Sequence, residues 1–210
     1  MAQKVNPDSS SERRLKPLRE RHRAETLAAI AGAAEEVFAR KGLLQARVDE
    51  IAARAGVSVG TVYNHFRDRR ALLSGLVERR RKELARKLDD DLARSEAEPF
   101  DAQLRSFTRT VFEHFESHRE FLAILLEADS ASLARPSEAS MELRKRVDAL
   151  AERGMRLGAL RRDHAALWGT LLFGAVRALL LHELRNPGQI PLAERADIAA
   201  GFFLRGAGGA

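Results

Sequence analysis

The sequence predicts an all-α fold, and three observations lead to that prediction. Apolar residues recur at spacings of three and four along most of the 210 residues, as they do on one face of a helix. No segment shows the alternation of apolar and polar residues that is typical of a strand. Gly42, Gly56, Pro136, Pro187 and Pro191 fall between the periodic segments, where they would end one helix and separate it from the next.

The N-terminal segment of the chain is expected to be an arm followed by a helix. Residues 1–20 predict a disordered basic arm, because they contain few apolar residues together with Pro7, Pro17 and a run of serines. This arm could lie along a DNA groove or remain a solvated tail. Helical spacing begins at Ala24 and predicts a first helix to Lys41, which Gly42 ends as a C-terminal cap.

Two short helices and one long helix are predicted next. Apolar residues of 48–55 and 59–66 each share one face, and Gly56 can take the positive φ that ends the first of these helices. Asp68 is a favourable N-cap for a fourth helix that reaches about Asp91. We therefore expect one helical domain over residues 21–70 and a larger one over 71–210, with the fourth helix connecting them.

The larger domain is expected to continue with five helices after a linker at 95–99. Their predicted ranges are 100–117, 119–130, 138–157, 164–186 and 191–205. The most apolar stretch of the chain runs from Ala165 to Val176 and stops at Arg177. A bilayer needs about 20 apolar residues, so this stretch predicts a buried helix and no membrane span.

Charge is distributed unevenly along the chain. Residues 1–90 contain 20 basic and 13 acidic residues, whereas residues 91–210 contain 16 and 17. An excess of positive charge in one part is expected where that part meets phosphate, although it can also serve solubility alone. There is no cysteine, which excludes disulfides and thiolate chemistry and suits a reducing cytoplasm. The first 25 residues show no apolar core of a signal peptide.

The segment 48–66 carries the most specific pattern. It predicts two short amphipathic helices joined by a tight turn, in which Ser58 can cap the second helix through its hydroxyl. The outward face of that second helix is small and polar, can form hydrogen bonds and contains no acidic residue. A helix that enters the major groove of DNA needs such a face. Its residues are Val59, Gly60, Thr61, Tyr63, Asn64 and His65.

The pattern closely resembles the DNA-binding domain of the TetR family of bacterial repressors. The resemblance runs from the first helix into the fourth. It rests on Gly56-Val57-Ser58, Gly60-Thr61-Val62-Tyr63, His65-Phe66 and Ala71-Leu72-Leu73. The remainder of the chain resembles the family in architecture, with several helices of which the last two are built to dimerise.

The resemblance implies roles for single residues. Thr61 and Tyr63 match positions that contact phosphate or base edges, His65 a position near the DNA backbone, and Arg69 a basic position that meets phosphate. Val59 and Asn64 stand where sequence-reading side chains occur. Many relatives have Ser or Thr where this chain has Gln45-Ala46-Arg47, and Arg47 could replace their phosphate contact. The predicted DNA-binding residues are Arg47, Ser58, Val59, Gly60, Thr61, Tyr63, Asn64, His65 and Arg69.

A small-molecule pocket in the larger domain is implied by the resemblance and by the aromatic residues there. Most of these aromatic side chains would serve as core, but an aromatic-lined cavity between helices is also a common ligand site. The expected wall consists of Phe107, Val111, Phe115, Leu122, Leu126, Trp168 and Leu172. Arg109, His114 and Arg177 could orient a ligand, and an inward Arg177 would favour an anion.

The helix expected over 164–186 contains small residues among Leu and Val, which let two helices approach closely. Together with the last helix it predicts a two-fold four-helix interface between copies, with burial inside one chain as the alternative. The interface is expected to contain Gly174, Ala178, Phe202 and Phe203. A dimer would double the contacts across a palindromic DNA site.

Two motifs point to chemistry that we do not expect. Gly56 to Gly60 satisfies the G-x-S-x-G pattern of hydrolases, but a helix precedes it where a strand is needed. His114 and His118 have metal-ligand spacing on one helix face, but the sequence specifies no third ligand. We therefore predict neither an enzyme nor a metal or other cofactor.

The sequence thus predicts a cytoplasmic, dimeric transcriptional repressor that binds double-stranded DNA at a palindromic operator. An unidentified small-molecule effector would release it, by favouring a state with a different spacing of the recognition helices. The fourth helix would transmit this change, since it connects the two domains. The alternative is a regulator of the same fold without such an effector, either an activator or one controlled by a protein partner.

Overall fold

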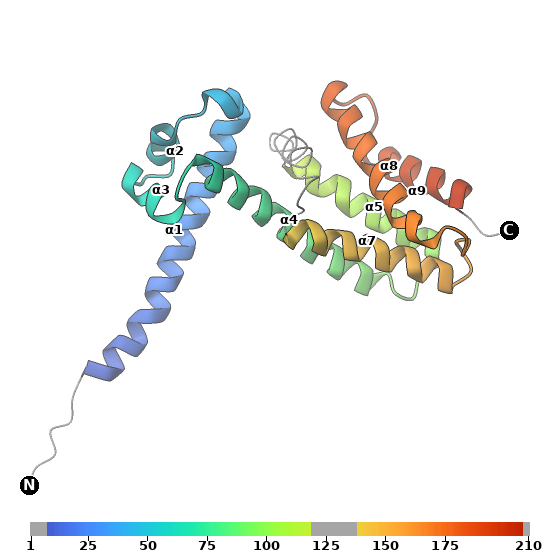
Figure 1. The fold of residues 1–210 in the computed structure, drawn as a ribbon, viewed down its shortest axis with the longest axis horizontal. Helices are drawn as coiled ribbons and strands as arrows, with labels where there is room; N and C mark the ends of the chain where they lie inside the picture. The colour runs from blue at the N-terminus through green and yellow to red at the C-terminus, as the bar shows by residue number, and fades with distance from the viewer. Residues whose placement is uncertain (1–7, 119–137, 208–210) are drawn as a thin grey trace, which may run out of the picture. The chain divides into compact units, whose positions relative to one another are not determined.

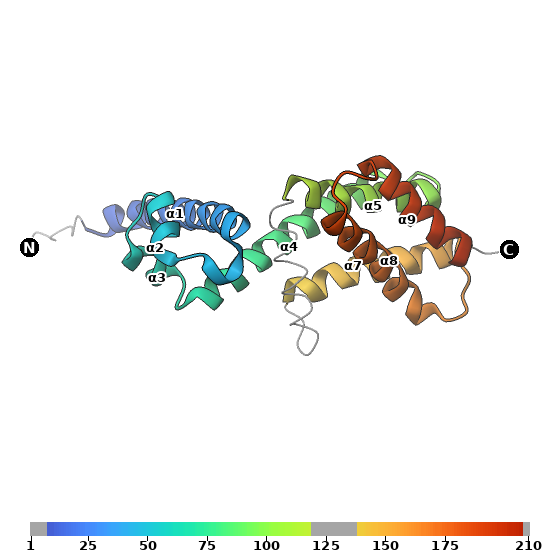
Figure 2. The same cartoon turned by 90° about the horizontal axis from the view of Figure 1, so that it is seen from above.

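The computed structural model describes residues 8–118 and 138–207, which confirm the all-α prediction with eight helices (Figures 1 and 2). The chain divides into two compact units, Met1–Ser74 and Gly75–Ala210. Each unit has its own buried apolar residues, and we describe each by itself. The helix expected over 119–130 lies outside the described residues.

The N-terminal unit contains α1 (Asp8–Gln45), α2 (Val48–Arg54), α3 (Val59–His65) and the first turns of α4 (Arg69–Arg94). Helix α2 packs against both α1 and α3, so that the three helices form one small bundle. Each of these helices contributes to the core of the unit. Phe38 of α1, Ile51 of α2 and Val62 of α3 are all at most 1% exposed. Leu72 from α4 closes the same core and is also 1% exposed.

Helix α1 is longer than the sequence analysis expects. It begins at Asp8 instead of Ala24, so residues 8–20 of the expected disordered arm are helical. Many residues of this segment are good helix formers, and Arg21 pairs with Glu25 one turn away at 3.1 Å. Gly42 interrupts the helix as expected, with φ 74° and ψ 170°, although one further helical turn reaches Gln45.

The C-terminal unit contains most of α4 with α5 (Phe100–Ser117), α7 (Glu138–Arg156), α8 (Ala165–Arg185) and α9 (Leu192–Ala207). Helix α5 packs mainly on α9, and α8 packs on both α7 and α9 (Figures 1 and 2). The shared core includes Leu104 and Phe112 of α5, which are fully buried, and Leu150 of α7 at 1% exposure.

A buried arginine ties three helices of this unit together. Arg195 of α9 is 5% exposed and donates from Nε to the carbonyl oxygen of Ile190 at 2.9 Å. Its other end pairs with Glu116 of α5 at 3.1 Å and lies 3.7 Å from Glu183 of α8. A buried charge needs such partners, so Arg195 holds the start of α9 against α5 and α8.

Helix α8 is less buried than expected. The sequence analysis judged the apolar stretch too short for a bilayer, but the helix has 21 residues and is long and apolar enough by length and composition alone. Trp168, Leu172, Val176 and Leu180 recur every four residues and are all at most 8% exposed, so one stripe belongs to the core of the unit. Only 28% of the most apolar window is buried, which leaves another face of α8 open.

Candidate DNA-binding and effector sites

Helix α3 is held at its start by the cap that the sequence predicts. Ser58 has the extended backbone of an N-cap (φ −76°, ψ 155°), and its Oγ accepts from the backbone N–H of Thr61 at 3.0 Å. The hydroxyls of Ser58 and Thr61 are 2.9 Å apart, so the two side chains also bond each other. Gly56 has φ 68° and forms the turn between α2 and α3, where a Cβ would be strained.

The outward face of α3 is the candidate DNA-reading surface. Val59 is 39% and Tyr63 48% exposed, although both are large and partly apolar. Gly60 and Asn64 are also exposed, while Thr61 and His65 are half-buried beside them. Val62 points the other way into the core at 1% exposure. The predicted residues of this helix therefore share one solvent-facing surface that can donate and accept hydrogen bonds.

Arg47 is the N-cap residue of α2 but gives no side-chain cap. Its guanidinium instead pairs with Asp49, with Nε to Oδ1 at 3.1 Å and Nη2 to Oδ2 at 2.9 Å. Both side chains are exposed, and the hydrogen bond from Arg47 holds the pKa of the Asp49 carboxyl below its usual range. A phosphate contact by Arg47 would have to compete with this carboxylate.

Arg69, which is predicted to meet phosphate, is half-buried at the start of α4. Its guanidinium carbon lies 5.6 Å from the centre of the Phe38 ring, and its Nε and Nη2 are buried without a hydrogen-bond partner in the described part of the chain. The stacking on Phe38 supplies packing and a cation–π contact instead. Arg67, two residues earlier, has a side chain that is 92% exposed, and the exposed Arg70 follows on α4.

The sequence analysis missed Arg67 as a candidate phosphate-binding residue. The available signal was its place beside Asp68, whose Oδ1 caps α4 by accepting from the Ala71 N–H at 2.7 Å. That hydrogen bond is the main reason why the pKa of Asp68 lies below its ordinary value. Arg67 also pairs with Asp68 at 3.3 Å, so it lies at the exposed start of α4.

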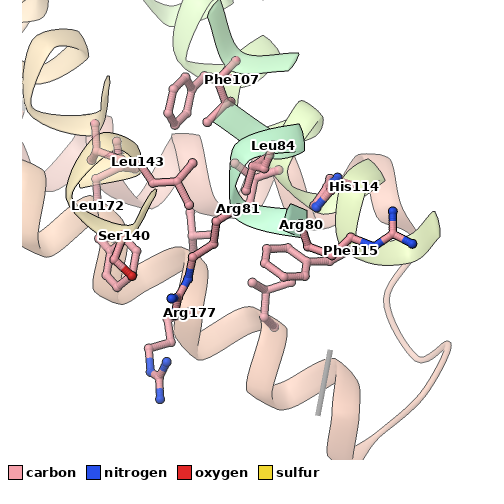
Figure 3. Close-up of a pocket in the computed structure, with 16 residues that line it drawn as sticks. Arg80, Arg81, Leu84, Phe107, His114, Phe115, Ser140, Leu143, Leu172 and Arg177 are labelled. Atoms are coloured by element: carbon pink, nitrogen blue, oxygen red, sulfur yellow. The ribbon is translucent and has the colours of Figure 1, made fainter. Parts of the chain in front are cut away.

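A largely apolar cavity of about 110 Å³ lies within the C-terminal unit, between α4, α5, α7 and α8. Figure 3 shows Leu84, Phe107, Leu143 and Leu172 around it. Four of the predicted wall residues line it, and so do the predicted polar residues His114 and Arg177. The lining comprises Arg80, Arg81, Leu84, Leu88, Phe107, Val111, His114, Phe115, Ser140, Leu143, Val147, Leu172, Phe173, Val176, Arg177 and Leu180.

Two of the predicted pocket residues lie elsewhere in the unit. Trp168 packs edge-on against Phe203, with ring centroids 6.1 Å apart, and its Nε1–H donates to the carbonyl oxygen of Arg161 at 2.9 Å. These contacts hold the indole between α8 and α9, away from the cavity. Arg109 is exposed on α5. Leu122 and Leu126 lie outside the described residues.

Polar residues of α4 and α5 gather at one side of the cavity. Arg80 donates from Nη1 to Glu83 Oε2 at 2.7 Å, and the same nitrogen lies 2.9 Å from Nε2 of His118. Burial alone would raise the pKa of Glu83, but Arg80 and the two histidines His118 and His114 together outweigh burial, and the pKa falls to about 2. Burial, helped by the neighbouring His118, lowers the pKa of His114 to about 4. His114 is therefore neutral at neutral pH.

The predicted interface residues separate into exposed and buried ones. Gly174 and Ala178 are exposed on α8, and Phe202 of α9 is 68% exposed. Phe203 is only 5% exposed and packs on Trp168, so it belongs to the core of its own unit. Other large apolar side chains on the open faces of α8 and α9 are Leu167, Leu171, Phe173 and Ile198.

Comparison with known proteins identifies the N-terminal unit. Residues 30–76 match the family described as bacterial regulatory proteins, tetR family. A stretch of 58 residues is 43% identical to the HTH-type transcriptional repressor BepR of Brucella suis biovar 1 (strain 1330). That match covers 28% of this chain and 28% of BepR, so it concerns little more than a quarter of either protein.

Solved structures resemble the fold over most of the chain. FadR of Bacillus subtilis, in complex with stearoyl-CoA, is 19% identical with a TM-score of 0.73, over 85% of this chain and 98% of that one. SmeT, the repressor of the Stenotrophomonas maltophilia multidrug efflux pump SmeDEF, is 22% identical with a TM-score of 0.66, over 88% and 92% of the two chains. At these identities the likeness concerns the fold.

The sequence match and the fold agree on one family. The all-α prediction and the resemblance read from segment 48–66 are both confirmed. The matching family consists of regulators and not of enzymes, which confirms that the G-x-S-x-G pattern here does not mark a hydrolase. Residues 30–76 belong to the tetR family of bacterial regulatory proteins, and the N-terminal unit is a helix-turn-helix DNA-binding domain of that family.

Proposed function

We propose that this regulator is a homodimeric repressor, which leaves its operator when a largely apolar molecule with an anionic group enters the cavity of the C-terminal unit. The observation that carries this proposal is the composition of the cavity. Its wall is apolar over most of its extent, and Arg80, Arg81 and Arg177 also line it. Apolar walls with a few polar groups are typical of small-molecule sites, and arginine favours carboxylate and phosphate.

The volume of the cavity bears on how release would work. About 110 Å³ is well below the roughly 300–1,000 Å³ of ordinary ligand pockets, so a ligand would have to separate the surrounding helices. Helix α4 supplies four residues of the wall and is continuous from Arg69, in the N-terminal unit, to Arg94. A displacement of α4 would therefore reach the DNA-binding unit through the chain itself.

The open faces of α8 and α9 support a dimer. Phe202, Leu167 and Leu171 are all more than half exposed, which is costly in water for apolar side chains so close together on two packed helices. Gly174 and Ala178 add small residues where a second helix could approach. A two-fold dimer would present two α3 helices, which would bind half-sites roughly 34–36 Å apart.

Relatives with known names agree with this proposal. BepR and SmeT are both named as repressors, and FadR of Bacillus subtilis was solved with stearoyl-CoA, an apolar chain attached to an anionic carrier. Carried over to this chain, they support repression and an amphipathic anionic effector.

The first experiment is a titration of the full chain against a duplex from just upstream of its own gene, with a scrambled duplex as control. We expect at least a roughly hundredfold preference at near-physiological salt, since specific sites exceed non-specific ones by far more. Equal binding to both duplexes would contradict a regulator of its own gene. The complex is then exposed to decanoate, to decanol and to stearoyl-CoA.

Release by the anionic compounds but not by decanol would support the proposed effector class. The Arg177→Gln variant should then need more decanoate for the same release. If none of the three compounds releases the protein while specific binding persists, the regulator without a small-molecule effector becomes the better description.

A further inference from the structure

We propose that Glu83 of α4, His114 of α5 and His118, the residue that caps the end of α5, form a binding site for a divalent transition-metal ion such as Zn²⁺ or Co²⁺. Each of the three residues offers one ligand atom, and these atoms all lie within 4.8 Å of one another. The sequence analysis found only the two histidines, because Glu83 is 31 residues away along the chain. The packing of α4 beside α5 supplies the third ligand.

The state of His114 is the first independent observation. It is 1% exposed, and neither Nδ1 nor Nε2 has a hydrogen-bond partner in the described part of the chain. A buried imidazole normally bonds at least one ring nitrogen, because an unsatisfied polar atom in the interior is costly. Its ring lies 4.8 Å from the His118 ring at 88°, so an ion beside His118 would provide the missing partner.

The second observation is the direction of the lone pairs of Glu83 and His118. The guanidinium of Arg80 can only donate, so Nε2 of His118, 2.9 Å from Arg80 Nη1, accepts. That same nitrogen faces Glu83 Oε1 at 3.4 Å, and an ionised carboxylate is also only an acceptor. Two acceptors facing each other call for a cation between them.

In this structure Arg80 supplies that positive charge to Glu83 and His118. Glu83 is also approached by Lys87, whose Nζ lies 3.4 Å from Oε1. A metal ion would take the place of Arg80 as the partner of both Glu83 and His118. It would also bind His114, to which no guanidinium donates in the described part of the chain. Ligand atoms about 3.4 Å apart fit a tetrahedral ion with bonds of about 2.0–2.1 Å. The His114 ligand atom lies within 4.8 Å of the other two and would have to move closer to join them.

The donor set selects the class of metal. Two imidazoles and one carboxylate suit Zn²⁺, Co²⁺ or Ni²⁺, whereas Mg²⁺ and Ca²⁺ prefer oxygen ligands alone. Three protein ligands leave a fourth position open to water. His114 also lines the apolar cavity, so the site lies at the cavity wall.

The test is a titration of the full chain with Co²⁺, after expression without a tag and removal of metal with a chelator. We expect one Co²⁺ per chain, with the visible absorption of a four- or five-coordinate ion and no thiolate band, since the chain has no cysteine. Zn²⁺ should displace Co²⁺ and abolish the absorption. The His118→Gln and Glu83→Gln variants should each bind Co²⁺ at least about tenfold more weakly. Loss of a residue that only supports a metal ligand already weakens binding by about that factor, and loss of the ligand itself should weaken it more.

His182→Gln is the matched control, because His182 is exposed on α8 and lies outside the three-residue site. Its affinity for Co²⁺ should equal that of the unaltered chain. Circular dichroism of each variant shows whether it is folded. Because two ligand variants are made, the proposal can still be tested if one of them does not fold. No Co²⁺ binding, or binding that both ligand variants retain, would overturn the proposal. So would binding that is lost in His182→Gln.

Discussion

At the scale of single residues, the candidate DNA-reading surface depends on one buried and one exposed side chain of the same short helix. Val62 anchors α3 in the core, and Tyr63 next to it projects into solvent with 48% exposure. Ser58 holds the start of the helix through its bond to the Thr61 N–H. The direction in which Tyr63 projects thus depends on the buried anchor and the N-cap of its own helix.

Tyr63→Phe is predicted to weaken operator binding about tenfold, because it removes a hydroxyl that can bond a charged phosphate, a bond worth roughly 1.5 kcal/mol. Isothermal titration calorimetry with the operator duplex would measure this. The urea midpoint should stay unchanged, since the exposed hydroxyl has no partner among residues 8–118 and 138–207. Unchanged affinity for the operator would remove Tyr63 from the DNA contacts.

Residue roles were predictable from the sequence where they depend on local backbone. The Ser58 cap and the outward face of α3 follow from spacing within a few residues. The surroundings of Arg69 were not predictable in this way, because they are made by Phe38, a residue of another helix. Glu83 was missed for the same reason, since only the packing of α4 on α5 brings it to His118.

At the scale of helices, the boundaries were predictable where glycine, proline or a capping residue interrupts the periodicity. The predicted ranges 100–117 and 164–186 differ from α5 and α8 by at most one residue at each end. The start of α1 was not predictable in this way, because residues 8–20 contain too few apolar residues to show a helical periodicity. Trp168 is an aromatic residue of the kind expected in a pocket wall, but its packing on Phe203 determines where it lies.

Gly154 near the end of α7 provides a test of how closely these helices pack. A Cβ at Gly154 would lie 2.4 Å from Cζ of Phe100 and 2.7 Å from Cδ1 of Leu160. Gly154→Ala is therefore predicted to lower the free energy of unfolding by about 1–3 kcal/mol, as overpacking does. Urea denaturation followed by circular dichroism measures the change.

Gly174→Ala is the matched control for this substitution. It also lies within a helix, but its Cβ would meet nothing within 4 Å. Alanine should then keep or raise the stability, by up to about 1 kcal/mol from its better helix propensity. Equal destabilisation by the two substitutions would show that the loss at Gly154 does not come from its close contacts.

At the scale of the whole molecule, function requires two copies of the chain if the open faces of α8 and α9 form the interface. Gly174→Glu should leave the single chain folded, because nothing lies near the new Cβ. It would place a carboxylate in the dimer, where burial without a partner costs several kcal/mol. We predict at least a roughly tenfold weaker dimer by analytical ultracentrifugation and a matching loss of operator affinity.

Ala149→Glu on α7 is the control for the added charge, since Ala149 is exposed on a different helix. That variant should dimerise and bind the operator as the unaltered chain does. If Gly174→Glu remains a dimer with full operator affinity, the chains associate through another surface.

The position of Trp168 has an optical consequence. It is the single tryptophan of the chain, it is 6% exposed, and it is held between Phe203 and Arg161 where α8 meets α9. The single tyrosine, Tyr63, belongs to the other unit. Tryptophan fluorescence of the unlabelled protein therefore comes from the C-terminal unit alone, and a shift of its emission on adding an effector would report a rearrangement at α8 and α9 without any chemical probe.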